Sequence, residues 1–528
     1  MNPTTSTTGL FLCRRSRTVL MADIADDLKK QGTINSACAY YVGDPSQHAT
    51  TLSRFDDIYN DIDVFSPDIS SLSDERIRQL EVCYDDSNFL WNTFYAERAL
   101  VQIEQDLNSP PRNYKHSDAY ALIIKALHYA DFTISNARSA FIFDISALGL
   151  QRLAFQAAAK FYSIPFFLLG HSRIGERYTI YDDLFYTHNQ ITKSYYQLTI
   201  RNCICQTNQD GQEVIKSIQN NEPIYLGHAG ALPSSPSLEG SKTIPRNSFF
   251  NIRAKTPRFV TSTLSSAIGK AATERNYTKR GLINYVDDRA RAEDMIKNLL
   301  KSRYRSYKNR QTINNKLHDE LPENQNKIKI LFTWHVQPEQ STSQLAPFHV
   351  NQDIAVSNIA RVAPLNSIVI VKPHPSTLGK VRPNVLQLLS RLPNVYFALP
   401  ERPTAEIIPH CSAVVTLTGT SGLEGLAFGK PTFYFGMPSW RICNGATHCQ
   451  TFEDLGRHLR NLKNHQPDSH DLANYFQAIV DNSVHIPEGK PIIREPHNHK
   501  GKQSYKAAIK LISSQITSKL QIKNAIEH

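Results

Sequence analysis

The chain has 528 residues, of which 41% are hydrophobic and 20% are charged. This length exceeds what one ordinary hydrophobic core organises, so two or three domains are expected. No apolar run approaches the roughly 20 residues that a membrane-spanning helix needs. The amino terminus lacks the long apolar run of a secretory signal. We therefore expect a cytoplasmic protein.

The formal net charge of +11 favours acidic partners such as nucleotide phosphates or anionic lipid headgroups. Much of the excess positive charge is concentrated in 252–316, whose basic segment 289–316 includes the run KNLLKSRYRSYKNR. A peripheral contact with the inner membrane is one interpretation of this segment, and a solvated linker face is the other. The basic residues are not interleaved with aromatics into a stacking platform, so we expect no nucleic-acid partner.

The eight cysteines are scattered through separate predicted elements and lack the paired spacing of a zinc site. We read them as reduced thiols, most of them structural. No metal is expected.

The first half of the chain opens like a Rossmann-type domain. A strand from Gly9 to Cys13, a helix from about Ser16 to Lys30 and a strand from Ala37 to Val42 follow one another. The further predicted elements are a helical region at 72–107, a helix at Asp118–His128, a strand at Asp131–Ser135, a loop at Asn136–Ser139, a helix at Asp144–Tyr162 and a strand at Ile164–Leu169.

Clustered ionisable residues follow the last of these strands, in the segment GHSRIGERYTIYDDLFYTH at 170–188. Its pair Asp182 and Asp183 is a candidate for catalysis, because a positioned carboxylate can take a proton or attack an electrophilic carbon. The alternative is that one of the two caps the next helix. The sequence leaves both interpretations open.

Strands and helices alternate strictly from Lys327 onward, which predicts a second parallel sheet with helices on both faces. The Pro/Ser/Gly-rich run after Gly230 separates the two halves. The predicted domains are 1–230, a linker and basic helical segment at 231–325, a second domain at 326–480, and a tail at 481–528 whose helix packs back on the first domain.

The stretch AVVTLTGTSGLEGLAFGKPTFYFG, at 413–436, reads as strand, turn, short helix and strand. Such a turn lies at the carboxyl end of its strand, where open α/β folds bind ligands. We predict that Thr418, Thr420, Ser421 and Gly422 hold a phosphate, and that Glu424 accepts from a ribose hydroxyl. The alternative is a tight turn beside a solvated glutamate.

Two other loops follow neighbouring predicted strands, HVQPEQSTS at 335–343 and KPHPST at 372–377. They supply a carboxylate (Glu339), a lysine (Lys372) and a histidine between two prolines (His374). An imidazole at His374 can donate a hydrogen bond to a phosphate as charge develops on it, so the leaving group needs no metal. We predict that these loops and the 413–436 turn form one site.

These three loops resemble the capsule polysaccharide biosynthesis family of bacterial glycosyltransferases, which includes the Kdo transferases. The resemblance covers about 327–440, and SRIGERYTIYDDLF in the first half is similar to a loop of that family. It implies the GT-B fold, α/β with two Rossmann-like domains facing across a cleft. The nucleotide-sugar is then on the second domain and the acceptor largely on the first.

The His-Pro pair at His374 and the hydroxyl-rich turn also resemble motifs of bacterial sialyltransferases, which use CMP-linked donors. That likeness implies that His374 contacts the donor phosphate, that the turn holds phosphate or nucleotide, and that Glu424 lies near the ribose. One departure is the first-half segment SNARSAFIFD, where family members often carry a Pro-His pair followed by an acid. Asp144 is the nearest acid here.

We therefore expect a metal-independent glycosyltransferase of capsule or lipopolysaccharide synthesis, with CMP-Kdo or a related acidic sugar as donor and a glycan or glycolipid as acceptor. Asp182 or Asp183 would be nucleophile or base, Glu339 a second carboxylate, and His374 the group that assists phosphate departure. No cofactor beyond the donor is expected. A polyol-phosphate transferase, a sugar-nucleotide epimerase and a non-catalytic assembly component are the alternatives.

Overall fold

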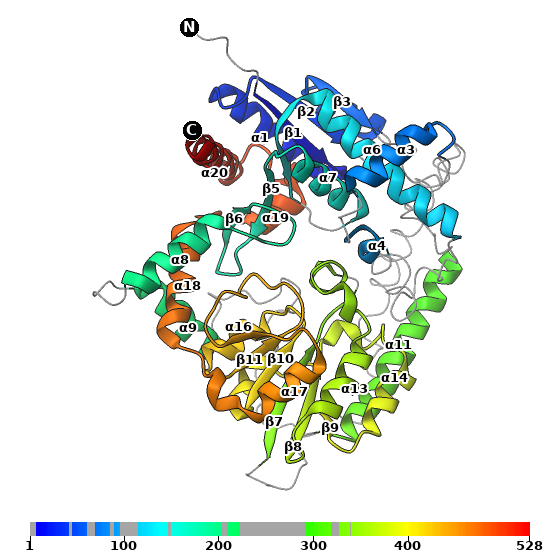
Figure 1. Cartoon of the computed structure of the whole chain (residues 1–528), viewed down its shortest axis with the longest axis vertical. Helices are drawn as coiled ribbons and strands as arrows, with labels where there is room; N and C mark the ends of the chain where they lie inside the picture. Colours follow the sequence, from blue (N-terminus) through cyan, green and yellow to red (C-terminus); the bar gives the residue numbers. More distant parts are fainter. Residues whose placement is uncertain are drawn as a thin grey trace.

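The chain folds around two β-sheets, one above the other in Figure 1. The computed structural model describes residues 7–41, 45–60, 69–84, 89–94, 115–145, 149–201, 208–221, 292–317, 327–337 and 339–527. We call the seven-stranded sheet with its covering helices the first domain, and the six-stranded sheet with its helices the second domain. Most of the predicted linker at 231–325 lies outside the described residues.

The first sheet has the strand order β13-β6-β5-β4-β1-β2-β3. Strands β1 to β5 are parallel, whereas at one edge β6 runs antiparallel to β5, and β13 runs antiparallel to β6. The parallel part therefore has the 3-2-1-4-5 order of a Rossmann domain. The strands are β1 (Thr8–Cys13), β2 (Ser36–Tyr41), β3 (Asp57–Asn60), β4 (Ser139–Asp144), β5 (Phe166–His171), β6 (Arg177–Tyr181) and β13 (Val484–His485).

Strand β1 is buried on both faces, which explains why a continuous apolar run forms the centre of the sheet. Leu10 and Leu12 pack with α6 and α7, while Phe11 and Cys13 pack with α1 and α20. The helices before the second domain are α1 (Thr18–Lys30), α2 (Ala49–Leu52), α3 (Asp74–Tyr84), α4 (Phe89–Phe94), α6 (His116–Ala137), α7 (Leu150–Phe161), α8 (Asn189–Arg201) and α9 (Gln209–Gln219).

Three of the predicted elements in the first half are wrong: the strand Asp131–Ser135, the loop Asn136–Ser139 and the helix starting at Asp144. The segment Asp131–Ser135 belongs to helix α6, because Ala130, Ile134 and Ala137 are buried at helical spacing. The strand is instead β4, of which Asp144 is the last residue, and helix α7 does not begin until Leu150. Asp144 therefore stands at the carboxyl end of a central strand.

The second sheet has the order β12-β11-β10-β7-β8-β9 and is parallel throughout. This is the 3-2-1-4-5-6 order of a Rossmann domain. The predicted fold class, α/β with two Rossmann-like domains, is confirmed. The strands are β7 (Ile328–Trp334), β8 (Ser367–Pro373), β9 (Val395–Phe397), β10 (Ala413–Thr416), β11 (Thr432–Tyr434) and β12 (Ala446–His448).

Helices cover both faces of the second sheet. Helices α13 and α17 pack on one face, and α15 and the start of α16 adjoin the other, where Leu331, Ile370 and Val414 form a separate core. The helices are α11 (Ala292–Asn314), α12 (Gln340–Ser343), α13 (Gln352–Val362), α14 (Pro383–Ser390), α15 (Thr404–Ile407), α16 (Ser421–Ala427), α17 (Phe452–Arg460), α18 (Ser469–Asp481), α19 (Gly489–Arg494) and α20 (Gln503–Glu527).

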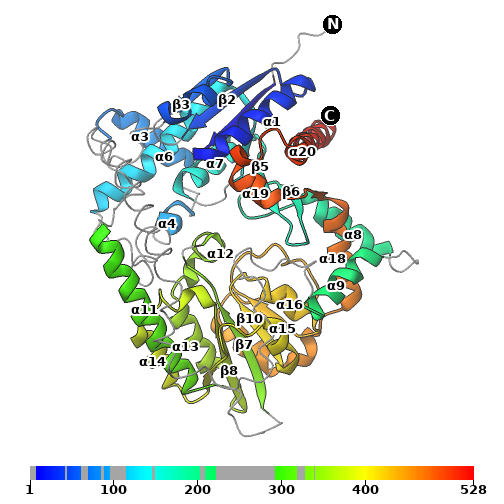
Figure 2. The same cartoon turned by 180° about the vertical axis from the view of Figure 1, so that it is seen from behind.

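The carboxyl-terminal segment returns to the first domain. Strand β13 pairs with β6, and helix α20 lies beside α1 in both views of the molecule (Figures 1 and 2). The hydroxyl of Tyr505 donates to Asp23 at 2.6 Å, and the hydroxyls of Thr33 and Thr517 are 2.8 Å apart. The first domain is thus built from both ends of the chain.

Helix α11 carries the basic residues of 292–314 along the second domain. The amide of the fully buried Asn309 donates to the carbonyl oxygens of Leu378 and Val381 at 2.8 and 2.9 Å, so this face of the helix is fixed. Lys301 and Tyr304 are exposed to solvent. Among the described helices, none combines the length and the apolar character that a membrane crossing would require.

Candidate functional site

The three predicted loops meet at one edge of the second sheet. Strands β7, β8 and β10 are adjacent and parallel, so the segments that follow them lie together. The segment 335–343 follows β7, 374–377 follows β8, and 417–422 follows β10. The neighbours β7 and β10 are also the strands at which the chain order reverses, and open α/β sheets bind ligands at such a switch point.

The turn after β10 is held by its own hydroxyl groups. Thr416 Oγ1 accepts from the Gly419 amide at 3.0 Å, and Thr418 Oγ1 donates to the Ser341 carbonyl at 2.6 Å. Ser421 Oγ lies 2.6 Å from Thr333 Oγ1. Thr418 and Ser421 therefore bond within the protein and fix the turn against the neighbouring loop. Phosphate binding by this turn stays a prediction.

His335 is a residue of the site that the sequence did not single out. Its ring Nε2 lies 3.0 Å from Thr416 Oγ1 and accepts from the Leu417 amide at 3.3 Å. Gln352 clamps its backbone with two hydrogen bonds of 2.7 and 3.0 Å. The only available signal was the position of His335 directly after a strand, because Gln352 is 17 residues away on another element.

The glycines of the turn are required by close packing. A Cβ atom on Gly422 would lie 2.1 Å from Cζ2 of the buried Trp440, and one on Gly419 would lie 2.7 Å from Cε1 of His335. Neither glycine is among the residues with positive φ. The turn therefore uses glycine for space.

We expect Gly422→Ala to destabilise the protein by about 3 kcal/mol or more, because the Trp440 ring is rigid and cannot yield cheaply; overpacking of a core typically costs about 1–3 kcal/mol. Urea denaturation followed by tryptophan fluorescence measures this loss. For comparison, Gly32→Ala at the end of α1 adds a Cβ with no atom within 4 Å, so it should lose only about 1–2 kcal/mol to left-handed strain at φ +70°. A Gly422→Ala variant as stable as wild type would contradict the packing argument.

His374 is oriented by the residue two positions after it. The Ser376 amide donates to His374 Nδ1 at 3.2 Å, and Ser376 Oγ lies 2.7 Å from the same nitrogen. The proton of the neutral ring is therefore on Nε2. Burial lowers the pKa of His374 below its usual value, and the charges of Lys372 and Lys380 lower it further. The ring is neutral at pH 7 and can donate from Nε2.

Lys372 and Glu424 interact at the same edge. Burial raises the pKa of Glu424 to about 7, against the opposing effects of Lys372 and a hydrogen bond from Thr404. Burial also lowers the pKa of Lys372, whereas Glu424 and Glu401 raise it. Lys372 Nζ donates to the Pro400 carbonyl at 3.2 Å. The site thus places a cation within electrostatic range of a carboxyl group whose pKa is about 7.

Glu339 connects this edge to the first domain. Burial raises the pKa of Glu339, and the charges of Arg173 and Lys380 oppose that shift. Arg173 lies in the turn between β5 and β6 of the first domain, with a φ of +72°. The Lys380 ammonium donates to the Gln337 carbonyl at 2.9 Å. A half-buried carboxylate of one domain therefore faces a guanidinium of the other.

Asp182 and Asp183 both bond to other groups of the first domain. The segment 170–188 forms a β-hairpin with β6 instead of the predicted loop. Asp182 accepts from the Asn189 amide at 2.8 Å and pairs with Lys519. Asp183 accepts from two amides of the same loop at 2.8 and 2.9 Å. These bonds agree with the alternative that one of the two aspartates caps the next helix. A catalytic role for either residue stays a prediction.

The loop that carries these aspartates nevertheless reaches the second domain. The Tyr186 hydroxyl donates to Gln340 Oε1 at 2.7 Å, and the amides of Gln340 and Gln344 donate to the Leu184 carbonyl at 3.0 Å. Figure 2 shows α12, which contains Gln340, at the edge of the second domain that faces the first. The structure therefore brings together Glu339, Lys372, His374 and the 418–424 segment, with the hairpin loop beside them.

The described residues contain no group of three or more histidine, cysteine, aspartate or glutamate side chains suited to holding a metal ion. The described cysteines are unpaired thiols, of which Cys443 and Cys449 are buried. Burial raises the pKa of both thiols. Cys203 and Cys205 lie outside the described residues.

Two Rossmann-like domains with a loop site at the switch point of the second place the chain in the class of two-domain α/β proteins with GT-B-like architecture. Residues 252–479 match the family model described as capsule polysaccharide biosynthesis protein. Residues 252–479 therefore resemble the capsule polysaccharide biosynthesis family, and the resemblance drawn from the loops is confirmed over this segment. A comparison with curated proteins gave no match.

Several solved structures share similarity with the chain. The beta Kdo 2,4 transferase KpsC of Thermosulfurimonas dismutans is 12% identical over 64% of this chain and 79% of its own, with a TM-score of 0.32. The Neisseria meningitidis UDP-GlcNAc 2-epimerase bound to UDP-GlcNAc is 11% identical over 90% and 99%, with a TM-score of 0.23. Anabaena Alr3699/HepE in complex with UDP and glucose is 11% identical over 93% and 100%, with a TM-score of 0.27. At these TM-scores the similarities do not identify a reaction.

Proposed function

We propose that the chain is a glycosyltransferase of bacterial capsule or lipopolysaccharide synthesis. It transfers a sugar from a nucleotide donor on the second domain to a glycan or glycolipid acceptor held mainly by the first. The observation that best supports this proposal is His374, a neutral imidazole with its proton on Nε2, between Lys372 and Lys380 at the switch-point edge. Two cations and a hydrogen-bond donor suit a phosphate leaving group.

In the proposed reaction the bond between the anomeric carbon and the donor phosphate breaks, and an acceptor hydroxyl oxygen forms the new bond to that carbon. The electron pair of the broken bond stays on the phosphate, where His374 donates a hydrogen bond to the developing charge. Glu339 is the carboxylate proposed to take the acceptor proton, because it lies in the loop after β7 at the same sheet edge as His374 and burial raises its pKa. Glu424 accepts from a ribose hydroxyl.

The proposed donor is CMP-Kdo or a related acidic sugar, and the family resemblance supports this choice. The same family supports a site of action at the cytoplasmic face of the inner membrane, with contact through 289–316. In the part of that segment that the structure describes, Arg303 and Tyr304 are exposed and Asn309 is turned toward the second domain. A helix fixed along one face and basic along another suits an anionic surface.

Thermal-shift titration with CMP, UDP, GDP and CDP, each with and without magnesium, tests the donor. Selective stabilisation by CMP that needs no magnesium supports the proposal, and product analysis with the matching CMP-sugar then shows sugar transfer. Stabilisation by UDP or CDP would favour an alternative reaction. An epimerised nucleotide-sugar as product would then identify an epimerase, and a polyol-phosphate product would identify a polyol-phosphate transferase. If no nucleotide binds, the proposal fails and a non-catalytic assembly component takes its place.

A further inference from the structure

Three arginine side chains gather at the carboxyl ends of β1 and β4 in the first domain. Arg17 ends a 3₁₀ turn, η1 (Arg15–Arg17), between β1 and α1, and Arg152 is in the first turn of α7. Arg494 ends α19, and Ser16 Oγ donates to its carbonyl oxygen at 3.4 Å. We call Arg17, Arg152 and Arg494 the arginine cluster. Segments from three parts of the chain thus converge at one point.

The buried part of the cluster is an ion pair. Arg152 Nε lies 2.7 Å from Asp144 Oδ2, with only 5% and 1% of the two side chains exposed. The other oxygen of Asp144 accepts from the Ile145 amide at 2.7 Å, and Arg17 Nη1 donates to the Ile145 carbonyl at 3.4 Å. Arg17 therefore lies against the same short segment that holds the pair.

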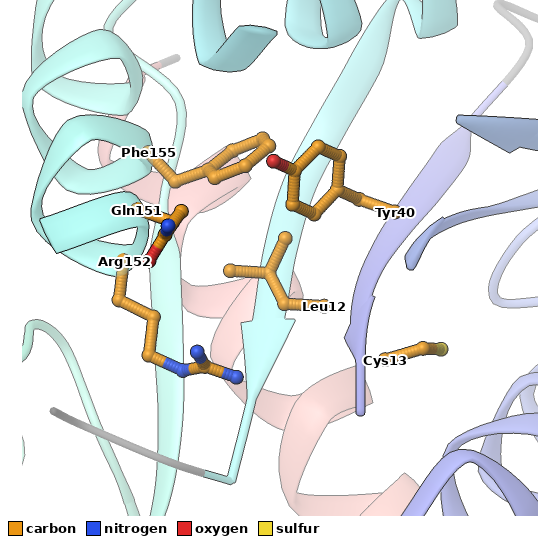
Figure 3. A pocket seen from close by; sticks show the side chains of 6 residues that line it. All are labelled: Leu12, Cys13, Tyr40, Gln151, Arg152 and Phe155. Carbon is orange, nitrogen blue, oxygen red and sulfur yellow. The ribbon is translucent and has the colours of Figure 1, made fainter. Parts of the chain in front are cut away.

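Figure 3 shows a small pocket beside this pair. Leu12, Tyr40 and Phe155 form its apolar part, and the guanidinium of Arg152 lies away from them. The pocket belongs to the space between β1, β2 and α7. A buried guanidinium at the end of an apolar pocket is costly unless its charge is balanced.

Positive charge exceeds negative charge around Arg17. The groups that act on it electrostatically are one carboxylate, Asp144, and two guanidiniums, Arg152 and Arg494. The pKa of Arg17 lies below its usual value, first because burial removes water from it, and then because the two guanidiniums repel it while Asp144 offsets part of the shift. The amino terminus of the 13-residue helix α1 adds partial positive charge at the same place.

The arginine cluster lies at the switch point of the first sheet, as the loop site lies at the switch point of the second sheet. Strands β1 and β4 are the neighbours at which the strand order of the first sheet reverses, so their carboxyl ends form its switch point. Strand β5 is parallel to β4 and ends at the same edge, where Arg173 acts on Glu339 of the second domain. The arginine cluster therefore lies at the same edge of the first sheet as Arg173, which acts on Glu339 of the proposed donor site.

Building on the proposed function, we propose that the arginine cluster binds an anionic group of the acceptor, a carboxylate or a phosphate. The acceptor is then an acidic glycan or a phosphate-bearing glycolipid, and Arg17 is the residue that receives its charge. Arg152 stays paired with Asp144 and supplies the surrounding positive field. Arginine suits this role because its planar fork matches carboxylate and phosphate geometry.

The test measures binding of two small anions without any donor. Glucuronate probes a sugar carboxylate and glycerol 3-phosphate probes a phosphate, with glucose and glycerol as neutral counterparts and the ionic strength held constant. Isothermal calorimetry or thermal shift follows wild type, Arg17→Gln and Lys30→Gln. Lys30 is exposed at the far end of α1, so its variant removes the same charge outside the cluster.

We expect wild type and Lys30→Gln to bind an anion but not its neutral counterpart, and Arg17→Gln to bind it about tenfold or more weakly, since charged hydrogen bonds contribute about 1.5–3 kcal/mol. Binding of glucuronate alone would identify the anionic group of the acceptor as a sugar carboxylate. Binding of glycerol 3-phosphate alone would identify it as a phosphate. Binding that is equal in Arg17→Gln, or absent for both anions, overturns the inference.

Nucleotide titration of the same variants separates the two proposals. If nucleotides bind and neither anion does, the acceptor inference fails while the proposed function stands. If an anion binds through Arg17 and no nucleotide binds, the proposed function fails and the anion site remains. Should Arg17→Gln not fold, Arg494→Gln at the exposed end of α19 gives the same comparison, with weaker anion binding expected and unchanged binding contradicting the cluster.

Discussion

Replacing His374 by alanine is expected to lower the rate of sugar transfer by about 10²–10³-fold, the usual cost of removing one hydrogen-bond donor from a developing negative charge. The variant lacks the imidazole and its Nε2–H donor, while the ammonium groups of Lys372 and Lys380 remain. Initial rates with the donor identified by nucleotide titration measure the change. Since the lost interaction is strongest in the transition state, kcat should fall more than KM rises.

The exposed His410 provides the matched control, and His410→Ala should keep the wild-type rate. His374→Gln retains an N–H donor and should recover part of the loss. A His374→Ala variant with the full rate would remove His374 from the mechanism. If His410→Ala lost as much activity as His374→Ala, the loss would be attributed to misfolding and not to the chemical step.

Replacing Asp144 by alanine is expected to reduce the free energy of unfolding by about 3–5 kcal/mol, because it leaves the buried Arg152 charge without its partner. The Ile145 amide also loses its acceptor. Thermal or urea denaturation measures the loss. Cys13 borders the same pocket, and burial followed by the Asp144 charge keeps its pKa well above the usual value.

The Arg402–Glu406 pair is the control for this second prediction. Its atoms are 3.5 Å apart on the surface, and the Glu406 side chain is 58% exposed. Glu406→Ala should therefore cost no more than about 0.5 kcal/mol. An Asp144→Ala variant that loses less than the surface control would show that Arg152 finds another partner or reaches water.

The second domain was largely predictable from the sequence, whereas part of the first was not. Strands such as Ala413–Thr416 are continuous apolar runs followed by glycine-rich turns, and that pattern is local. The segment Asp131–Ser135 is short, apolar and β-branched, so its periodicity did not separate a strand from a buried helix. Its helical state depends on contacts of Ala130 and Ile134 with another layer.

Some residues of the candidate site were also predictable from the sequence, and others were not. Glu339, Lys372, His374 and Glu424 could be grouped from the sequence, because parallel strands end at one edge. The two hydrogen bonds from Gln352 to the His335 backbone and the ion pair of Asp182 with Lys519 could not, because their partners lie on other elements. The hairpin at 170–188 did have a signal, since Gly175 stands between two apolar runs and adopts a positive φ of 48°.

The return of the carboxyl-terminal segment to the first domain has a consequence for biosynthesis. Chains emerge from the ribosome amino terminus first, and domains generally fold as units in that order. The first sheet here has to wait for β13, and α1 for α20, and both elements follow the last strand of the second sheet in the chain. The second domain can therefore complete its own sheet before the first domain does.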